Sequence, residues 1–270
     1  MAKRVLIVND DGIDGPGIRL LERIAREFTD DVWVVAPDEE RSGAGQSISV
    51  SHPIRYVQRD ERHFAVRGTP ADCALLGINT FLGDRKPDIL LSGINAGPNL
   101  AEDVFYSGTC AAAREGALLG IPSVALSQLR TYQKHTHWEA SEAHLPGLLR
   151  EILASPWLPG RFLNVNVPNL PPDEIAGVRI TRQGQRPPGG FMPMRREDER
   201  FVPYFWIRIR PQPVRFEEGT DLEAISSGFI SVTPMQLDNT CQRMSDGLRH
   251  LATGEATPAA RNFDAEGMRA

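Results

Sequence analysis

Apolar runs alternate with amphipathic segments along the first half of the chain. The apolar runs have the length and content of buried strands and span residues 4–8, 31–37, 63–67, 87–95 and 122–127. Helical spacing of apolar positions follows in residues 16–28, 70–82 and 109–120. Strands that alternate with helices in this way predict an α/β fold, in which a mostly parallel sheet carries helices on both faces.

The pattern changes after about residue 130, which predicts a core α/β domain over 1–130 and its continuation over 131–250. Residues 137–155 are helical in pattern, although Pro146 is expected to kink or break the helix. Prolines, arginines and aromatic residues mix over about 183–220, which predicts an extended hairpin arm that packs on another subunit. Residues 228–238 predict a returning strand, and residues 251–270 a poorly ordered tail.

Composition excludes several functional classes. The chain has 270 residues and a formal net charge of −5, which argues against a protein that coats a nucleic-acid polymer. Its three cysteines form no CxxC pair, which favours a reducing, cytoplasmic location. The first apolar run is too short for a signal peptide or a membrane span, so no membrane partner is expected.

The first strand ends in two adjacent acidic residues, Asn9-Asp10-Asp11-Gly12. Neighbouring carboxylates repel each other unless a cation or a proton offsets the charge. One interpretation is a site for a hard divalent cation such as Mg²⁺ or Mn²⁺, which prefers carboxylate, amide and hydroxyl oxygens. The other interpretation, a turn or a helix cap, has about the same weight when this segment is considered alone.

Two further loops at the predicted strand ends favour the metal interpretation. Ser42 follows the second strand, Asn95 ends the strand over 87–95, and Asn99 follows in the same glycine-rich segment. Because the carboxyl ends of parallel strands share one edge of a sheet, these oxygens are expected beside Asp10 and Asp11. No His–Cys cluster favours zinc. A helix is expected to begin at Ser107-Gly108-Thr109, where backbone N–H groups and hydroxyls suit an anion, although plain N-capping is the commoner role.

Other familiar motifs are missing or incomplete. The glycines in residues 12–17 do not form GxGxxG, and no GxxxxGK[ST] occurs. Asn9 occupies the position that a phosphatase with an aspartate nucleophile would need for that nucleophile, which favours attack by water. His135 and His137 lie in a polar segment and are interpreted as solvated surface rather than a ligand pair.

These segments together resemble the SurE family, the stationary-phase survival proteins. The resemblance covers about residues 4–240 and rests on the blocks NDDG, RSG, SGIN-x-GxN and YSGT in this order. It implies a Rossmann-like domain with a C-terminal β-hairpin and helix extension that is exchanged between subunits of a homodimer or homotetramer. The implied activity is that of a metal-dependent phosphatase acting on nucleoside 5′-monophosphates and also 3′-monophosphates.

The resemblance also implies roles for individual residues. One Mg²⁺ or Mn²⁺ per subunit would be held by Asp10, Asp11, Ser42 and Asn95, with Asn9 supporting the site. Phosphate would be held by Asn99 and by Ser107, Gly108 and Thr109, with Gly68 and Thr69 nearby. Hydrolysis would then use a metal-activated water. Two alternatives stay open: an exopolyphosphatase acting on short chains, which the resemblance also implies, and a non-enzymatic module that binds nucleotide or metal.

Overall fold

The structure is a computed structural model that describes residues 3–131, 135–209 and 216–252. The chain divides into one compact unit, Met1–Leu237, and a second unit, Asp238–Ala270. The described part of the second unit holds a short helix α6 (Gln242–Gly247) and a 3₁₀ turn η4 (Arg249–Leu251). The domain boundaries expected near residues 130 and 250 stay predictions. From residue 253 onward, the expected disordered tail lies outside the described residues.

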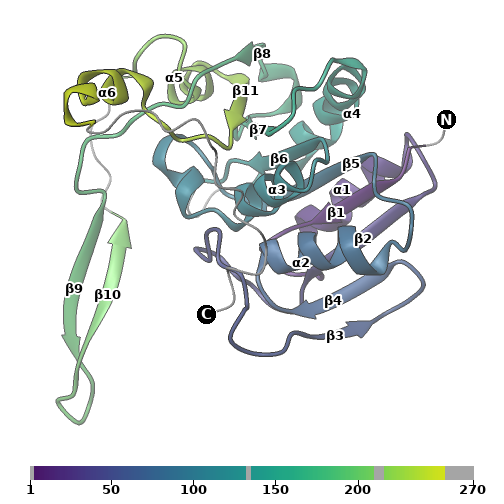
Figure 1. Cartoon of the computed structure of the whole chain (residues 1–270), viewed down its shortest axis with the longest axis horizontal. Helices are drawn as coiled ribbons and strands as arrows, with labels where there is room; N and C mark the ends of the chain where they lie inside the picture. Colours follow the sequence, from purple (N-terminus) through teal and green to yellow (C-terminus); the bar gives the residue numbers. More distant parts are fainter. Residues whose placement is uncertain (1–2, 132–134, 210–215, 253–270) are drawn as a thin grey trace. The chain divides into compact units, whose positions relative to one another are not determined.

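A nine-stranded sheet forms the centre of the first unit (Figure 1). Its order is β3-β4-β2-β1-β5-β6-β7-β11-β8. The strands are β1 (Val5–Val8), β2 (Val32–Pro37), β3 (Arg55–Gln58), β4 (His63–Arg67), β5 (Ile89–Ala96), β6 (Ser123–Gln128), β7 (Arg161–Val167), β8 (Gly177–Ile180) and β11 (Phe229–Gln236). Every pairing from β4 to β7 is parallel, whereas β3 and β11 pair antiparallel with β4 and β7. The predicted mostly parallel α/β fold is confirmed.

Helices pack on both faces of this sheet (Figure 1). On one face, α1 (Pro16–Arg26) and α4 (Trp138–Ala154) contribute buried residues to a common apolar cluster with the strands. On the other face, α2 (Pro70–Leu76), the π-helical turn η1 (Gly77–Phe81) and α3 (Gly108–Leu118) cover the sheet. All these helices follow strands of the parallel core, so the loops that enter them lie at the edge where the strands end.

Of the kink or break expected at Pro146, the break does not occur. Helix α4 continues from Trp138 to Ala154 with Pro146 inside it. Proline removes one backbone donor, but Leu145, Pro146 and Leu149 are buried against the sheet. Burial of an amphipathic face stabilises a helix more than one intrahelical hydrogen bond does, so packing overrides the local preference.

A separate antiparallel hairpin occupies the segment where an arm was expected. Strands β9 (Phe191–Glu197) and β10 (Pro203–Ile209) pair only with each other and extend away from the sheet (Figure 1). A short helix that the pattern did not predict, α5 (Asp221–Ser226), leads into the returning strand β11. The 3₁₀ turns η2 (Ala101–Phe105) and η3 (Pro172–Glu174) complete the unit.

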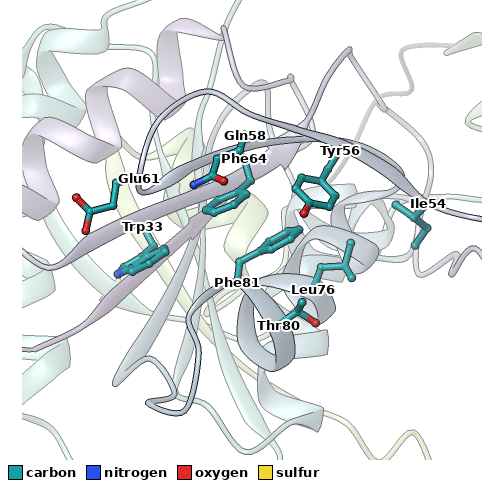
Figure 2. A pocket seen from close by; sticks show the side chains of 9 residues that line it. All are labelled: Trp33, Ile54, Tyr56, Gln58, Glu61, Phe64, Leu76, Thr80 and Phe81. Atoms are coloured by element: carbon teal, nitrogen blue, oxygen red, sulfur yellow. The ribbon is translucent and has the colours of Figure 1, made fainter.

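Aromatic side chains line a pocket on the α2 face of the sheet (Figure 2). Phe64 stacks on Phe81 at 4.3 Å between ring centroids, and Tyr56 lies 4.8 Å from Phe81. The pocket encloses about 460 Å³ and also contacts Trp33. Because Trp33 and Phe64 are the second residues of β2 and β4, this pocket lies toward the opposite edge of the sheet from the loops that follow these strands.

The helices of the described residues include none that is both long and apolar enough to cross a membrane. Cys73, Cys110 and Cys241 are free thiols. The cytoplasmic location expected from the sequence stays a prediction.

Helix α1 lies close to β5 at Gly17, so substitution of this glycine is expected to change stability. A Cβ at Gly17 would overlap the carbonyl oxygen of Ile94. We expect Gly17→Ala to lower the free energy of unfolding by about 1–3 kcal/mol, because a packed backbone must move. Gly147→Ala in α4 is the matched control, since a Cβ there meets open space, and it should raise stability by about 0.5–1 kcal/mol. Urea denaturation measures both, and equal stability of the two variants would contradict the close approach.

Candidate active site

The chain turns sharply after β1 and presents two acidic side chains at the edge of the sheet. Asn9 is fully buried, and its Nδ2 donates a hydrogen bond of 2.8 Å to the carbonyl oxygen of Gly12. Gly12 has φ of +91°, a conformation that favours glycine, and its backbone lies against Glu39. This turn places Asp10 and Asp11 where β1 ends.

The first turn of α3 is packed directly against Asp10. Thr109 Oγ1 donates a hydrogen bond of 2.5 Å to Asp10 Oδ1. A Cβ at Gly108 would lie 2.7 Å from the Cβ of Asp10 and 2.8 Å from Pro70 Cγ, so only glycine permits this approach. Ser107 caps the helix by accepting a 3.0 Å hydrogen bond from the Cys110 N–H. Ser107, Gly108 and Thr109 therefore lie together beside Asp10.

Asp11 is held by the loop that follows β5. Its Oδ2 accepts a 3.0 Å hydrogen bond from the Ala96 N–H. Asn95 precedes Ala96 and donates from Nδ2 to the Gly97 carbonyl oxygen at 2.9 Å. The β1 and β5 strand ends, which the sequence predicted to share an edge, are thus in direct contact.

The loop after β2 also reaches the end of β1. The Arg41 N–H donates a 2.8 Å hydrogen bond to the backbone carbonyl oxygen of Asp10. The neighbouring Ser42 is exposed, and its hydroxyl donates to Glu40 Oε1 at 2.9 Å. The structure therefore brings the Ser42 loop to the end of β1, but the Ser42 hydroxyl is hydrogen-bonded to Glu40 rather than to Asp10 or Asp11.

Asn99 lies in a buried network of asparagines rather than against the carboxylates. Its Nδ2 donates to Ser127 Oγ at 2.8 Å, and its N–H donates to Asn166 Oδ1 at 2.9 Å. Asn164 Nδ2 donates to the Asn99 carbonyl oxygen at 2.7 Å. Sequence reasoning missed Ser127, Asn164 and Asn166. The signal was present in β7, where two asparagines separated by one residue share a face of a buried strand.

Gly68 and Thr69 shape the start of α2. Thr69 Oγ1 accepts from the Asp72 N–H at 3.1 Å, and the Asp72 carboxylate accepts from the Thr69 N–H at 2.9 Å, which is a capping box. A Cβ at Gly68 would lie 2.9 Å from Asp72 Oδ2. The next residue, Pro70, is the one that packs against Gly108, so this loop reaches the site through its proline.

Burial determines the electrostatics of the acidic pair. The pKa of Asp10 is raised from 3.8 to about 6, chiefly by loss of hydration and also by the charge of Asp11, against the lowering effect of the Thr109 hydrogen bond. Burial also raises the pKa of Asp11, and the Glu40 charge adds to that rise, against the lowering effects of the Ala96 N–H hydrogen bond and the Arg130 charge. Among the described residues, neither carboxylate forms an ion pair with Lys, Arg or His.

These residues fit a divalent cation. The buried Asp10 and the partly buried Asp11, both with raised pKa values, need a compensating charge, and no described side chain forms an ion pair with either. Asn9 Oδ1 is buried and has no hydrogen-bond partner among the described residues. Carboxylate, amide and hydroxyl oxygens are the donors that Mg²⁺ and Mn²⁺ prefer.

Comparison with known proteins points to one family. A family model described as "Survival protein SurE" matches residues 5–189. A protein named "5′-nucleotidase SurE" from Mesorhizobium japonicum is 48% identical over 248 residues, which cover 91% of this chain and 98% of that protein. A protein of the same name from Rhodopseudomonas palustris is 48% identical over 250 residues, with the same coverage. The crystal structure of SurE protein from Aquifex aeolicus matches with a TM-score of 0.80 and 38% identity, covering 92% of this chain and 99% of that one.

The raised pKa of Asp10 predicts a pH-dependent effect on stability in the absence of divalent cations. Since the pKa rises from 3.8 to about 6 on folding, the ionised carboxylate destabilises the native state above pH 6. We expect Asp10→Asn, whose amide oxygen can still accept from Thr109, to raise the free energy of unfolding there by about 3 kcal/mol. The gain should disappear below the unfolded-state pKa, where the wild-type carboxyl is already protonated.

Asp14→Asn is the matched control in the same segment. Asp14 is exposed, and its hydrogen bonds to Arg59 lower its pKa, so its removal should not stabilise the protein at any pH. Urea denaturation of chelator-treated protein across this pH range measures both variants. Equal stability of Asp10→Asn and wild type at neutral pH would contradict the burial penalty.

Proposed function

Because this chain belongs to the SurE family, we propose that it is a 5′-nucleotidase that hydrolyses nucleoside 5′-monophosphates to nucleoside and phosphate. Relatives named 5′-nucleotidase SurE match about nine-tenths of the chain at 46–48% identity, which supports this activity. The observation that carries the proposal is the contact between the buried Asp10 and the first turn of α3. A phosphate there would meet both a carboxylate-bound cation and the amino end of a helix.

The proposed cofactor is one Mg²⁺ or Mn²⁺ per subunit, held by Asp10, Asp11, Ser42 and Asn95. When bound, such an ion would withdraw charge from a phosphate oxygen and lower the pKa of a coordinated water. Asp10 is buried and Asp11 is partly buried, and a divalent cation would offset their negative charges. Ser42 would have to exchange its hydrogen bond with Glu40, which its exposed position allows.

The proposed phosphate site is the amino end of α3. The first N–H groups of a helix have no intrahelical partner, so those near Gly108 and Thr109 suit phosphate oxygens and the charge that develops on them. Asn99 would complete the site from the loop after β5, with its backbone held by Asn164 and Asn166. Gly68 and Thr69 contribute by positioning Pro70 against Gly108.

The proposed nucleophile is water. Asn9 cannot form the phosphoryl–aspartate bond that an aspartate nucleophile would, and its amide is committed to the Gly12 turn. Asn9 therefore supports the site by fixing where Asp10 and Asp11 point. Asp10 or Asp11 would orient the attacking water or accept its proton.

Substitution of the acidic pair tests the activity. We expect Asp10→Asn and Asp11→Asn each to lower the phosphate-release rate from AMP by a factor of about 10²–10³ or more, because each removes a charge that holds the cation. Asp14→Asn, three residues further along and exposed, is the matched control and should keep wild-type activity. Activity should also vanish with a chelator and return with Mg²⁺ or Mn²⁺. Near-normal turnover by Asp10→Asn with verified metal content would overturn the proposal.

The same assay separates the finer alternatives. Rates on AMP, 3′-AMP and short polyphosphate compare 5′-nucleotidase, 3′-nucleotidase and exopolyphosphatase activities, and we propose activity on both nucleotides. Tight nucleotide binding without phosphate release from any substrate would instead favour a binding module.

We also propose that the β9–β10 hairpin mediates assembly into a homodimer or homotetramer. Phe205, Trp206, Ile207 and Ile209 expose more than half of their surface on this arm. Exposed apolar groups gathered on a two-stranded arm favour burial against another chain, since isolated hairpins are marginally stable in water. Exchange of the arm between subunits would bury them.

This proposal predicts the effect of polar substitutions on the arm. We expect the double variant Trp206→Ser, Ile207→Ser to shift the mass measured by light scattering toward that of the monomer, because the apolar contact area is lost. Val50→Ser is the control, since Val50 is 89% exposed but lies outside the hairpin. An unchanged oligomer in the double variant would contradict a role for this arm.

A further inference from the structure

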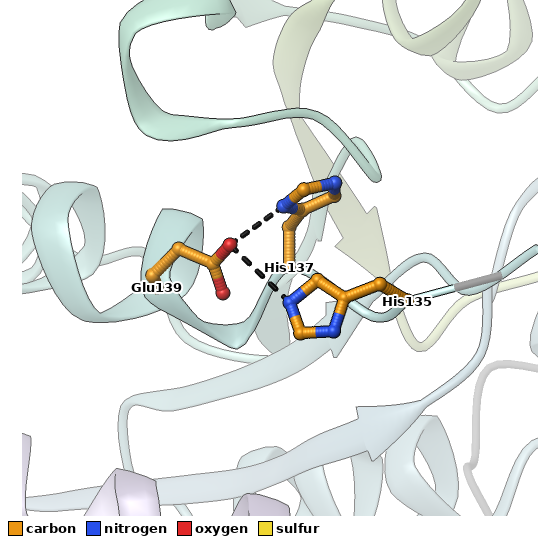
Figure 3. Close-up of side chains that lie close together, drawn as sticks. All are labelled: His135, His137 and Glu139. Carbon is orange, nitrogen blue, oxygen red and sulfur yellow. Dashed lines mark hydrogen bonds and ion pairs between the residues drawn. The ribbon is translucent and has the colours of Figure 1, made fainter.

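Two histidines and a glutamate converge at the start of helix α4 (Figure 3). His135 Nε2 lies 3.5 Å from Glu139 Oε1, and His137 Nδ1 lies 2.6 Å from the same oxygen. The two imidazole rings are 4.9 Å apart between centroids and nearly perpendicular. The ligand atoms of the three side chains all lie within 4.8 Å of one another, and no other group of three His, Cys, Asp or Glu residues within the described part of the chain does so.

A single side chain holds the backbone of both histidines. Asn169 Oδ1 accepts a 2.9 Å hydrogen bond from the His137 N–H, and Asn169 Nδ2 donates a 3.0 Å hydrogen bond to the His135 carbonyl oxygen. Asn169 follows β7, so the histidine segment is anchored to the sheet rather than to its own helix alone. Ligands that are positioned in advance lose less conformational freedom when they bind a metal.

In place of the solvated surface expected from the sequence, we propose that His135, His137 and Glu139 form a binding site for a late first-row divalent metal ion such as Zn²⁺. Two imidazoles and one carboxylate are a ligand set that zinc uses when it keeps a fourth position for water. Imidazole selects this class of metal over Mg²⁺, which prefers oxygen ligands. None of the three residues belongs to the proposed phosphatase site, so the inference does not rest on the proposed function.

The two distances to the Glu139 carboxylate suit such an ion after a small adjustment. Ligand atoms bound at 2.0–2.2 Å in a tetrahedral arrangement lie roughly 3.3–3.5 Å apart. The separation between His135 and Glu139 already has this value. The shorter contact between His137 and Glu139 must lengthen by less than about 1 Å, which the partly exposed Glu139 side chain permits by rotation.

Ion pairing between the histidines and Glu139 contributes too little free energy to explain why all three side chains converge. Exposed pairs between a carboxylate and a cationic side chain contribute about 0–1 kcal/mol. A second histidine directed at the same carboxylate oxygen adds little to that, because His137 already binds it. A bound cation, by contrast, uses all three groups at once.

Zinc titration of the full-length, untagged chain tests the site. Excess Mg²⁺ is included to occupy oxygen-rich sites, and isothermal titration calorimetry measures the number of Zn²⁺ ions and their dissociation constant. We expect one Zn²⁺ equivalent that is lost in the double variant His135→Ala, His137→Ala. Glu139→Gln should weaken that equivalent by about tenfold or more, and Asn169→Ala should weaken it by a smaller factor. Co²⁺ in place of Zn²⁺ should give the intense visible absorption of tetrahedral coordination in wild type only.

His52→Ala is the matched control, because His52 is exposed and lies on a different loop. It should leave the zinc equivalent intact. Circular dichroism and AMP hydrolysis with Mg²⁺ should be the same in all four variants, which shows that loss of zinc does not reflect unfolding. The proposal is overturned if the double histidine variant binds as much Zn²⁺ with the same affinity as wild type, or if wild type binds none under these conditions.

Discussion

The arrangement of this protein's acidic edge follows from one constraint, the placement of a buried carboxylate, Asp10, beside a partly buried one, Asp11, at the end of β1. Burial raises the pKa of Asp10 to about 6 and that of Asp11 in the same direction, and no described basic side chain pairs directly with either. The surrounding loops respond with neutral donors: the Thr109 hydroxyl to Asp10 and the Ala96 N–H to Asp11. Such donors orient the carboxylates without neutralising them, which leaves the charge available to a ligand.

The parallel core and the grouping of loops followed from local patterns. Apolar runs such as residues 87–95 become buried strands because their length and content leave them few alternatives, and parallel strands must end at a common edge. The contact of Asp10 with Thr109 could not be predicted from the sequence, because it depends on how closely α3 approaches β1. Gly108 makes that approach possible, but a glycine before a helix has many ordinary uses.

Two other features show where local patterns are insufficient. Pro146 lies inside a continuous helix because packing on the sheet outweighs the lost backbone hydrogen bond. Asn99 was placed in the correct loop, but its partners Asn164 and Asn166 lie more than sixty residues away in the chain. Hydrogen bonds at such separation depend on strand order, which the sequence pattern does not encode. The helix α5 was missed for a related reason, since six residues are too few to establish a period.

The amino end of α3 is joined to two separate segments, to Asp10 through Thr109 and to Pro70 through Gly108, and it is also capped by its own Ser107. The first turn of this helix therefore cannot fray alone, because its residues separate only if the end of β1 separates as well. Slow exchange of its amide hydrogens with solvent would then report on the acidic edge as a single cooperative unit. When the first turn of α3 opens, Asp10 and Asp11 therefore lose their alignment at the same time.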